Sequence, residues 1–235
     1  MPPIVLALTG ASGAPYGLRL LQVLLQAGQE VYLTISPSFG EVLRQELGIE
    51  IDLKRFTPQP LLADLQLWQT HLAQQGGWKS ALPGTGAPRL GESLPPLPID
   101  TSRLRYSHFQ DLLSPIASGS ALTAGMVVCP CSGSTLGAIA HSQGSNLIHR
   151  AAEVHLKERR KLILVPRETP LSLPQIENWR TATLAGAVVL PASPGFYHEP
   201  TGLLDLVDFV VARICDQLGV AHKLMRRWGS GQATE

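Results

Sequence analysis

The first 36 residues contain an apolar run, a glycine-rich loop, a helical pattern and a second apolar run, and this order restricts the fold more than any other feature. The run PIVLAL (3–8) is short and continuously apolar, as in a strand covered on both faces of a parallel sheet. Residues 13–28 carry leucines at helical spacing and end at Gly28, a typical helix terminator. EVYLTIS (30–36) predicts the next strand. Because such a unit builds parallel sheets with right-handed crossovers, we predict an α/β fold.

The same alternation continues through the second half of the chain. Further strands are predicted at 125–130, 161–166 and 186–191, and further helices at 135–142, 146–160, 173–184 and 202–218. With 235 residues, of which 44% are hydrophobic, the chain is long enough to bury the core of one domain spanning residues 1–235.

Residues 55–105 interrupt this alternation because they are rich in proline and glycine. Regular structure is not expected over 80–98, since prolines remove backbone donors and glycines raise the entropy cost of ordering. A linker between two domains would have a similar composition. Because the strand and helix pattern resumes afterwards, we interpret this region as an insertion into one domain.

Charge and cysteine content exclude several classes of protein. Lysines and arginines number 19 and aspartates and glutamates 18, so the net charge of +1 provides no bulk attraction to nucleic acid or to an anionic membrane. The N-terminal apolar run is too short for a signal peptide or a membrane span. Cys129, Cys131 and Cys215 lack the number and spacing of a disulfide framework or a zinc site, so we expect buried thiols and no metal. A soluble, cytoplasmic protein is expected.

The loop TGASG (9–13) follows the first predicted strand, at the edge of the sheet where parallel α/β domains bind ligands. Gly10 and Gly13 allow close approach of the backbone, and Ser12 offers a hydroxyl group. The start of the following helix offers N–H groups to an anion. The loop therefore predicts a phosphate of a nucleotide.

The residues after this loop indicate which nucleotide. The G-x-G-x-x-G fingerprint of dinucleotide sites is absent, and its variant would need glycines where Ala14 and Tyr16 stand. The second strand ends at Ser36 instead of the aspartate or glutamate that holds an adenosine ribose. A mononucleotide such as FMN is favoured over NAD(P).

A second loop, CSGST (131–135), places hydroxyl groups at the start of the next predicted helix. Serine there could bind a ligand, or it could cap the helix without any ligand. Tyr197 and Arg213 follow the last predicted strand and could hold one phosphate between them, although a tyrosine at a turn is usually only packed.

Charged residues stand in two further places. Arg150, Glu153 and Lys157 share one face of a predicted helix, where they form either an anion site or an ordinary surface pair of Glu153 with Lys157. Arg167 and Glu168 follow a predicted strand, where an arginine can hold phosphate and a carboxylate can transfer a proton. Structural capping is the alternative for these two.

Taken together, four motifs resemble the flavin prenyltransferase (UbiX) family: TGASGAPYGLRLL, VVCPCSGSTLGAIA, NLIHRAAEVHLKERRKLILVPRETPLS and LPASPGFYHEP. The match covers nearly the whole chain in the family's order, with 55–105 as the exception. The resemblance implies a single Rossmann-like, flavodoxin-like domain with a parallel sheet between helices, which binds FMN and assembles into a homo-oligomer, typically a dodecamer with the site between subunits. It implies metal-independent transfer of a dimethylallyl group from dimethylallyl monophosphate to N5 and then C6 of reduced FMN. A UbiD-type decarboxylase would receive the prenylated FMN.

The resemblance also implies roles for individual residues. FMN would be held by Gly10, Ala11, Ser12, Ser36, Ser132, Gly133, Ser134, Thr135 and Arg167. Dimethylallyl phosphate would be held by Arg150, Lys157, Glu168, Tyr197 and Arg213. The catalytic residues would be Ser12, Glu46, Arg150, Lys157 and Glu168. Ser12 would relay protons near N5, and Glu168 would act as acid and base toward the phosphate. Trp228 matches a C-terminal aromatic residue that, in relatives, covers a neighbouring subunit's site.

The sequence departs from the family at two places. Pro37 and Ser38 stand where many relatives read SKAA, next to the expected flavin. The insertion precedes SPIASGS (114–120), which borders the prenyl pocket in the family. The first departure could alter the backbone around the flavin, and the second could alter substrate access or the choice of allyl donor.

Two other functions are compatible with a flavin-binding α/β fold. A flavin-dependent cysteine decarboxylase shares the fold, but its PASANT signature is replaced here by PCSGST, and the first helix has no histidine. A flavin-binding subunit without turnover is the second alternative. The joint presence of five residues that match catalytic or substrate-binding positions of the family argues against this alternative: Glu46, Lys157, Glu168, Tyr197 and Arg213.

Overall fold

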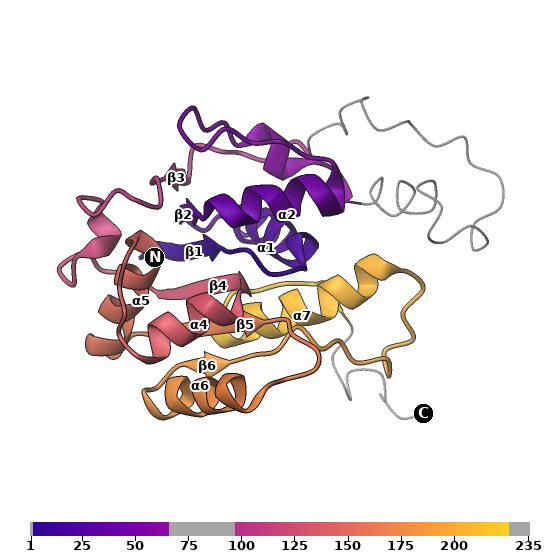
Figure 1. Ribbon diagram of the computed structural model, residues 1–235. Coiled ribbons are helices and arrows are strands. Elements are labelled where there is room, and N and C mark those ends of the chain that lie inside the picture. Colours follow the sequence, from indigo (N-terminus) through magenta and orange to yellow (C-terminus); the bar gives the residue numbers. More distant parts are fainter. Residues whose placement is uncertain (1, 66–96, 226–235) are drawn as a thin grey trace, which may run out of the picture.

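Six parallel strands form one sheet in the computed structural model, which describes residues 2–65 and 97–225 (Figure 1). The strands are β1 (Ile4–Leu8), β2 (Val31–Ile35), β3 (Leu104–Tyr106), β4 (Gly125–Cys131), β5 (Leu162–Pro166) and β6 (Val188–Val189). They lie in the order β3-β2-β1-β4-β5-β6, and each neighbouring pair is parallel. This is the doubly wound, Rossmann-like order, which confirms the predicted α/β class.

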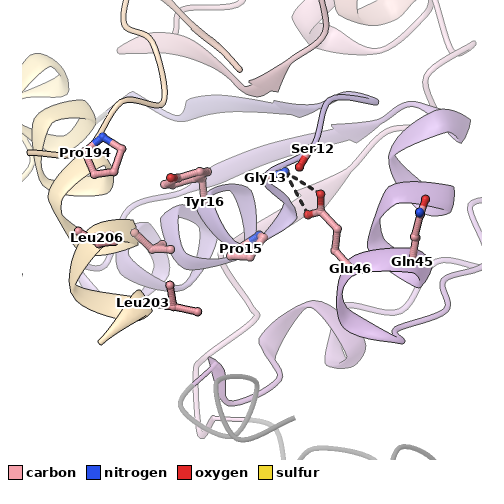
Figure 2. Close-up of a pocket in the computed structure, with 10 residues that line it drawn as sticks. Ser12, Gly13, Pro15, Tyr16, Gln45, Glu46, Pro194, Leu203 and Leu206 are labelled. Atoms are coloured by element: carbon pink, nitrogen blue, oxygen red, sulfur yellow. Dashed lines mark hydrogen bonds between the residues drawn. The ribbon is translucent and has the colours of Figure 1, made fainter. Parts of the chain in front are cut away.

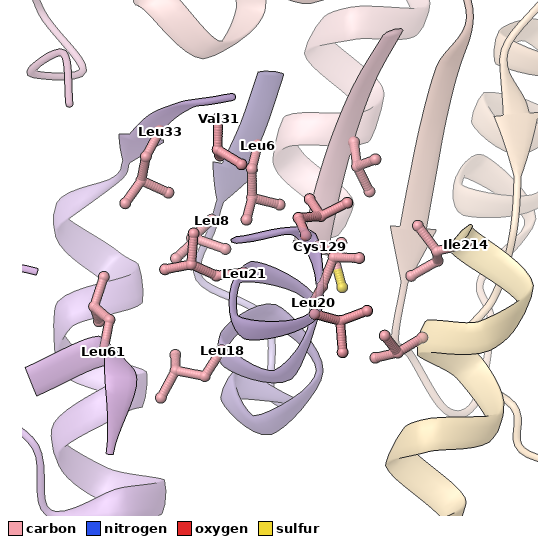
Figure 3. Packing of buried hydrophobic residues seen from close by; sticks show 14 of the residues in the cluster. Leu6, Leu8, Leu18, Leu20, Leu21, Val31, Leu33, Leu61, Cys129 and Ile214 are labelled. Atoms are coloured by element: carbon pink, nitrogen blue, oxygen red, sulfur yellow. The ribbon is translucent and has the colours of Figure 1, made fainter. Parts of the chain in front are cut away.

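Helices cover both faces of the sheet. One face carries α1 (Ala14–Gln26), α2 (Pro37–Leu47) and α7 (Leu203–Leu218), and the other carries α4 (Gly133–Ala140), α5 (Leu147–Lys157) and α6 (Leu173–Leu184). Alternate residues of β1 enter the two cores: Leu6 and Leu8 pack with the first group, Val5 and Ala7 with the second. Figure 3 shows the first core, where leucines of α1 lie beside β1 and Ile214 of α7 closes one side. Both faces of β1 are therefore buried, as its continuous apolar run predicts.

The helix α1 approaches the sheet very closely at Gly17. A Cβ atom there would lie 2.6 Å from the carbonyl oxygen of Cys129 and 2.8 Å from the side chain of Leu8, so only glycine allows this contact. Cys129, Cys131 and Cys215 are free and buried, and burial raises the pKa of each thiol. Such thiols stay protonated and act as small apolar core residues.

Most predicted elements are present, with shifted ends. Gly28 follows α1 with φ 71°, as expected of a terminating glycine. The strand predicted at 186–191 is reduced to the two residues of β6, and α5 ends at Lys157 instead of residue 160. Within the described ranges, no helix is both long and apolar enough to span a membrane.

The helix α2 and the strand β3 were not predicted. The helix has clear local signals, because Ser36 is its N-cap and accepts the N–H of Phe39, and Gly48 ends it with φ 67°. The strand β3 begins at the end of the region interpreted as an insertion, 55–105, and its three residues are too few to show periodicity. The short helices η1 (Gln59–Leu62) and η2 (Pro115–Ala117) complete the described elements. The irregular stretch predicted at 80–98 lies almost entirely outside the described residues.

Candidate active site

The candidate site lies at the carboxyl ends of β1, β2, β4 and β5. Since β1 and β4 are neighbours, and the helices that follow them pack on opposite faces, the sheet has its topological switch point between these two strands. Ligands of open parallel sheets bind at this point. The loops 9–13, 36–38, 132–135 and 167–172 all start from this edge.

Thr9 joins the ends of β1 and β4. Its buried hydroxyl donates to the carbonyl oxygen of Pro130 at 2.9 Å and accepts the N–H of Ser132 at 2.8 Å. Sequence reasoning did not single out Thr9. The available signal was a threonine directly after a fully buried strand, at the start of a glycine loop.

Gly10 brings the loop after β1 against the start of α2. A Cβ atom on Gly10 would lie 2.5 Å from the Cβ of Ser38, so the two backbones meet only because residue 10 is glycine. The hydroxyl groups of Ser36 and Ser38 lie 3.1 Å apart. Ser38, noted as a departure from the family, therefore faces the glycine loop directly.

Glu46 occupies the start of α1. Its carboxylate accepts the N–H of Gly13, 3.0 Å from each oxygen (Figure 2). It also accepts the N–H of Ala14 at 2.8 Å. The sequence predicted an anion at the start of α1. In the structure, the negative charge at this place is the carboxylate of Glu46, from α2 of the same chain.

A cavity of about 340 Å³ opens beside this contact. Ser12 and Glu46 lie at its polar side, while Tyr16, Leu203 and Leu206 are among its apolar walls (Figure 2). Burial raises the pKa of Tyr16. The positive charge of Arg167 opposes this rise in the pKa of Tyr16, which places Arg167 within electrostatic reach of the cavity.

The loop CSGST caps α4. Ser132 is the N-cap: its hydroxyl accepts the N–H of Thr135 at 3.2 Å and donates to the Thr135 hydroxyl at 2.9 Å. The capping alternative is therefore present in the structure. Ser134 remains exposed at the start of α4, so the loop still presents a hydroxyl group and a helix terminus to a ligand.

Arg167 and Glu168 lie exposed beyond the end of β5. The Glu168 carboxylate accepts the side-chain N–H of Gln175 at 3.0 Å, and that amide nitrogen lies 3.2 Å from the place a Cβ on Gly133 would take. Glu168 is thus held next to the start of α4. Gln175, half-buried on α6, was not identified from the sequence.

Arg150 and Lys157, both on α5, lie away from the carboxyl ends of the strands. The helix α5 leads into β5, and the Lys157 ammonium lies against Gly119, in the loop before β4. Lys157 therefore stands at the opposite end of β5 from Glu168, and this strand alone spans about 16 Å. Figure 1 shows α5 beside the amino-terminal ends of the strands.

The ion pairs on α5 also differ from the expected one. Lys157 pairs with Glu158 at 2.7 Å, and Arg150 pairs with Glu153 at 3.6 Å. Arg150 also donates to the carbonyl oxygen of Ala117 in η2 at 3.1 Å. The surface pair of Glu153 with Lys157, one of the two alternatives given by the sequence, is therefore not formed. Glu153 pairs with Arg150, and Lys157 pairs with Glu158.

Tyr197 and Arg213 border the same aromatic residue. The ring of Tyr197 meets Phe209 edge to face at 5.7 Å between centroids, and Phe209 and Arg213 line a second cavity of about 270 Å³ against β6. Arg213 pairs with Asp216 at 2.9 Å. Trp228, the remaining candidate, lies outside the described residues.

The sequence matches the Flavoprotein family over residues 1–215. It is 42% identical to the flavin prenyltransferase UbiX of Pseudomonas aeruginosa over 226 residues, which cover 96% of this chain and 93% of the relative.

Two solved structures share the fold. AnUbiX in complex with FMN and dimethylallyl pyrophosphate matches with a TM-score of 0.73 at 30% identity, covering 97% of both chains. A dodecameric FMN-dependent UbiX-like decarboxylase from Escherichia coli O157:H7 matches with a TM-score of 0.72 at 31% identity, covering 96% of this chain and 98% of that one. The chain therefore belongs to the flavoprotein family and, within it, to the UbiX flavin prenyltransferases.

Proposed function

We propose that this protein transfers a dimethylallyl group from a dimethylallyl phosphate to reduced FMN. The observation that carries this proposal is the meeting of three segments at the carboxyl ends of β1, β2 and β4, with Glu168 held beside them. The similarity to flavin prenyltransferases supports prenyl transfer as the reaction at this edge of the sheet.

The residues at this edge fit FMN. Gly10, Ala11 and Ser12 lie on the loop after β1, Ser36 begins α2, and Ser132–Thr135 begin α4, so hydroxyl and N–H donors face one place from three directions. We assign FMN binding to these residues and to Arg167. When bound and reduced, FMN supplies the electron pair for the new bond to the prenyl carbon.

The protein acts mainly on the leaving phosphate. As the allylic C–O bond breaks, its electron pair passes to the phosphate oxygen, where the charge must be neutralised. We assign this task to Arg150, Lys157, Tyr197 and Arg213. Glu168 delivers and takes up the proton of the phosphate, and Ser12 relays the proton that the flavin nitrogen loses. Glu46 holds the loop that carries Ser12.

The complete site requires more than one chain. Because Lys157 and Glu168 stand at opposite ends of β5, a phosphate that touches both must bring together two copies. We therefore propose a homo-oligomer, a dodecamer as described for the Escherichia coli relative, with α5 of one copy facing the carboxyl edge of another.

We further propose that the prenylated FMN passes to a UbiD-type decarboxylase in the cytoplasm. Three free, buried thiols suit a reducing compartment.

Mass spectrometry tests the proposed reaction. Purified protein incubated without oxygen with reduced FMN and dimethylallyl monophosphate is expected to yield a flavin heavier by one C5H8 unit. The diphosphate, tested in parallel, identifies the donor. Unchanged flavin with both donors contradicts the proposal, and release of CO2 from a cysteine peptide would support the decarboxylase alternative instead.

A further inference from the structure

Gln175, on the first turn of α6, forms hydrogen bonds at both ends of its amide. The oxygen accepts the N–H of Ser172 at 2.9 Å and its hydroxyl at 3.0 Å, while the nitrogen donates to Glu168 at 3.0 Å. Ser172 in return accepts the N–H of Gln175, which completes a capping box. The side chain thus belongs at once to a helix cap and to a contact with the proposed acid and base.

The capping box determines which end of the amide faces Glu168. A backbone N–H can only donate, so the oxygen of the amide must lie toward Ser172. The NH2 group is then left pointing at the carboxylate, and the reverse orientation would set two acceptors against each other at one end and two donors at the other. The geometry of α6 therefore presents a donor to Glu168.

The same amide also lies against the start of α4, since its nitrogen is 3.2 Å from the place of a Cβ on Gly133. Gly133 belongs to the loop assigned to FMN. Gln175 consequently holds the Glu168 carboxylate beside this loop, although it lies seven residues further along the chain.

We propose that Gln175 is a positioning residue for proton transfer, which orients the Glu168 carboxylate by donating to it. This inference rests on the proposed function for Glu168. The inference extends that function by a second residue. In the proposed role, Gln175 touches neither the flavin nor the phosphate and acts only through Glu168.

The variant Gln175→Glu separates this role from the cap. Glutamate at this position of a capping box still accepts the N–H of Ser172, so α6 keeps its cap. The donor to Glu168 is lost, however, and a like charge takes its place, which disfavours the ionised form of a carboxylate. Single turnover is expected to slow about tenfold, and the acidic limb of its pH profile to move up by about one pH unit. The rate is measured at saturating FMN, so that any change in flavin affinity caused by the new charge near Gly133 does not enter it.

The exposed Gln59, at the start of η1, provides the control. Gln59→Glu makes the same chemical change and is expected to leave the rate and the pH profile at wild-type values. If wild-type protein makes prenylated FMN and the two variants behave alike, the role of Gln175 is refuted while the proposed function stands. If wild-type protein makes no prenylated FMN, the proposed function fails. The contact between Gln175 and Glu168 is then tested by thermal unfolding alone.

Thermal unfolding supplies that second measurement, which needs no flavin. Repulsion between two carboxylates grows as both ionise, so Gln175→Glu should lose Tm relative to wild type as the pH rises from about 4 to 7. In the double variant Glu168→Gln with Gln175→Glu, an amide again donates to a carboxylate. Its Tm should therefore return toward wild type while turnover stays low. A Tm of Gln175→Glu that shows no dependence on residue 168 would overturn the inference.

Discussion

The carboxylate of Glu46 satisfies amide groups at the start of α1. A helix start leaves its first N–H groups without partners inside the helix, and Glu46 accepts those of Gly13 and Ala14. A negative charge also faces the positive end of the helix dipole there. While this contact persists, a phosphate at the loop must use other donors, and the hydroxyl of Ser12 is next to them along the chain.

Replacing Glu46 should therefore weaken the fold. Glu46→Gln sets an NH2 group where a carboxylate oxygen accepts an N–H, so we expect a loss of about 1.5–3 kcal/mol in the free energy of unfolding, the range for hydrogen bonds to charged groups. Urea denaturation followed by circular dichroism measures it. Glu41, exposed on the same helix and paired with Arg44, is the control. Glu41→Gln should cost less than about 1 kcal/mol. Equal effects of both variants would refute the structural role of Glu46.

Among the secondary-structure elements, β1 and β4 are held together by more than their ladder. The hydroxyl of Thr9 connects the loop that begins α1 with the loop that begins α4, across the switch point of the sheet. This hydrogen bonding connects two of the segments assigned to FMN, so we expect a change in one to affect the other.

The variant Thr9→Val tests this connection. Valine has the same shape but removes the acceptor of the half-buried N–H of Ser132, which should cost about 1–3 kcal/mol and weaken FMN binding. Thr34 in β2 is a matched control, because it is equally buried and its hydroxyl has no hydrogen-bond partner within the described part of the chain. Thr34→Val should be neutral or stabilising. Calorimetry and flavin titration of both variants would show the difference, and similar results for both would contradict the connection.

At the scale of the whole molecule, the sheet separates the charged residues. Arg150 and Lys157 belong to α5, at the amino-terminal edge, whereas Glu168 belongs to the carboxyl edge. If the proposed roles of these residues hold, one chain carries two partial sites at opposite edges of the sheet. Closed symmetry allows each partial site to meet its complement on another copy.

Mixing inactive variants tests this arrangement. Lys157→Ala and Glu168→Gln should each abolish most activity, but an oligomer reassembled from equal amounts of both should regain about a quarter of its sites, since some sites receive intact halves from two chains. A mixture of Arg150→Ala with Lys157→Ala should stay inactive, because both changes lie on the same helix. Prenyl transfer measured on the mixed oligomers, with native mass spectrometry to confirm mixing, would decide it. No recovery in the first mixture would place the complete site within one chain.

Much of the fold was predictable because its signals are local. The buried run of β1, the leucines of α1 and the terminator Gly28 all act within a few residues. The strand β3 was missed because its three residues acquire their conformation from pairing with β2. The roles of Thr9 and Gln175 were missed for the same reason, since each depends on a contact that the sheet creates.

The sequence by itself indicated most of the strands and helices in their succession along the chain, favoured FMN over a dinucleotide, and supplied the residue types available for chemistry, because these follow from periodicity, missing glycines and motif chemistry. Only the tertiary structure decided which of those residues meet. Packing of two helical layers on one sheet placed Glu168 beside Gly133 at the start of α4, and it placed the Glu46 carboxylate at the start of α1. Which loops meet depends on the order in which the strands lie side by side in the sheet. No local pattern in the chain specifies this spatial order.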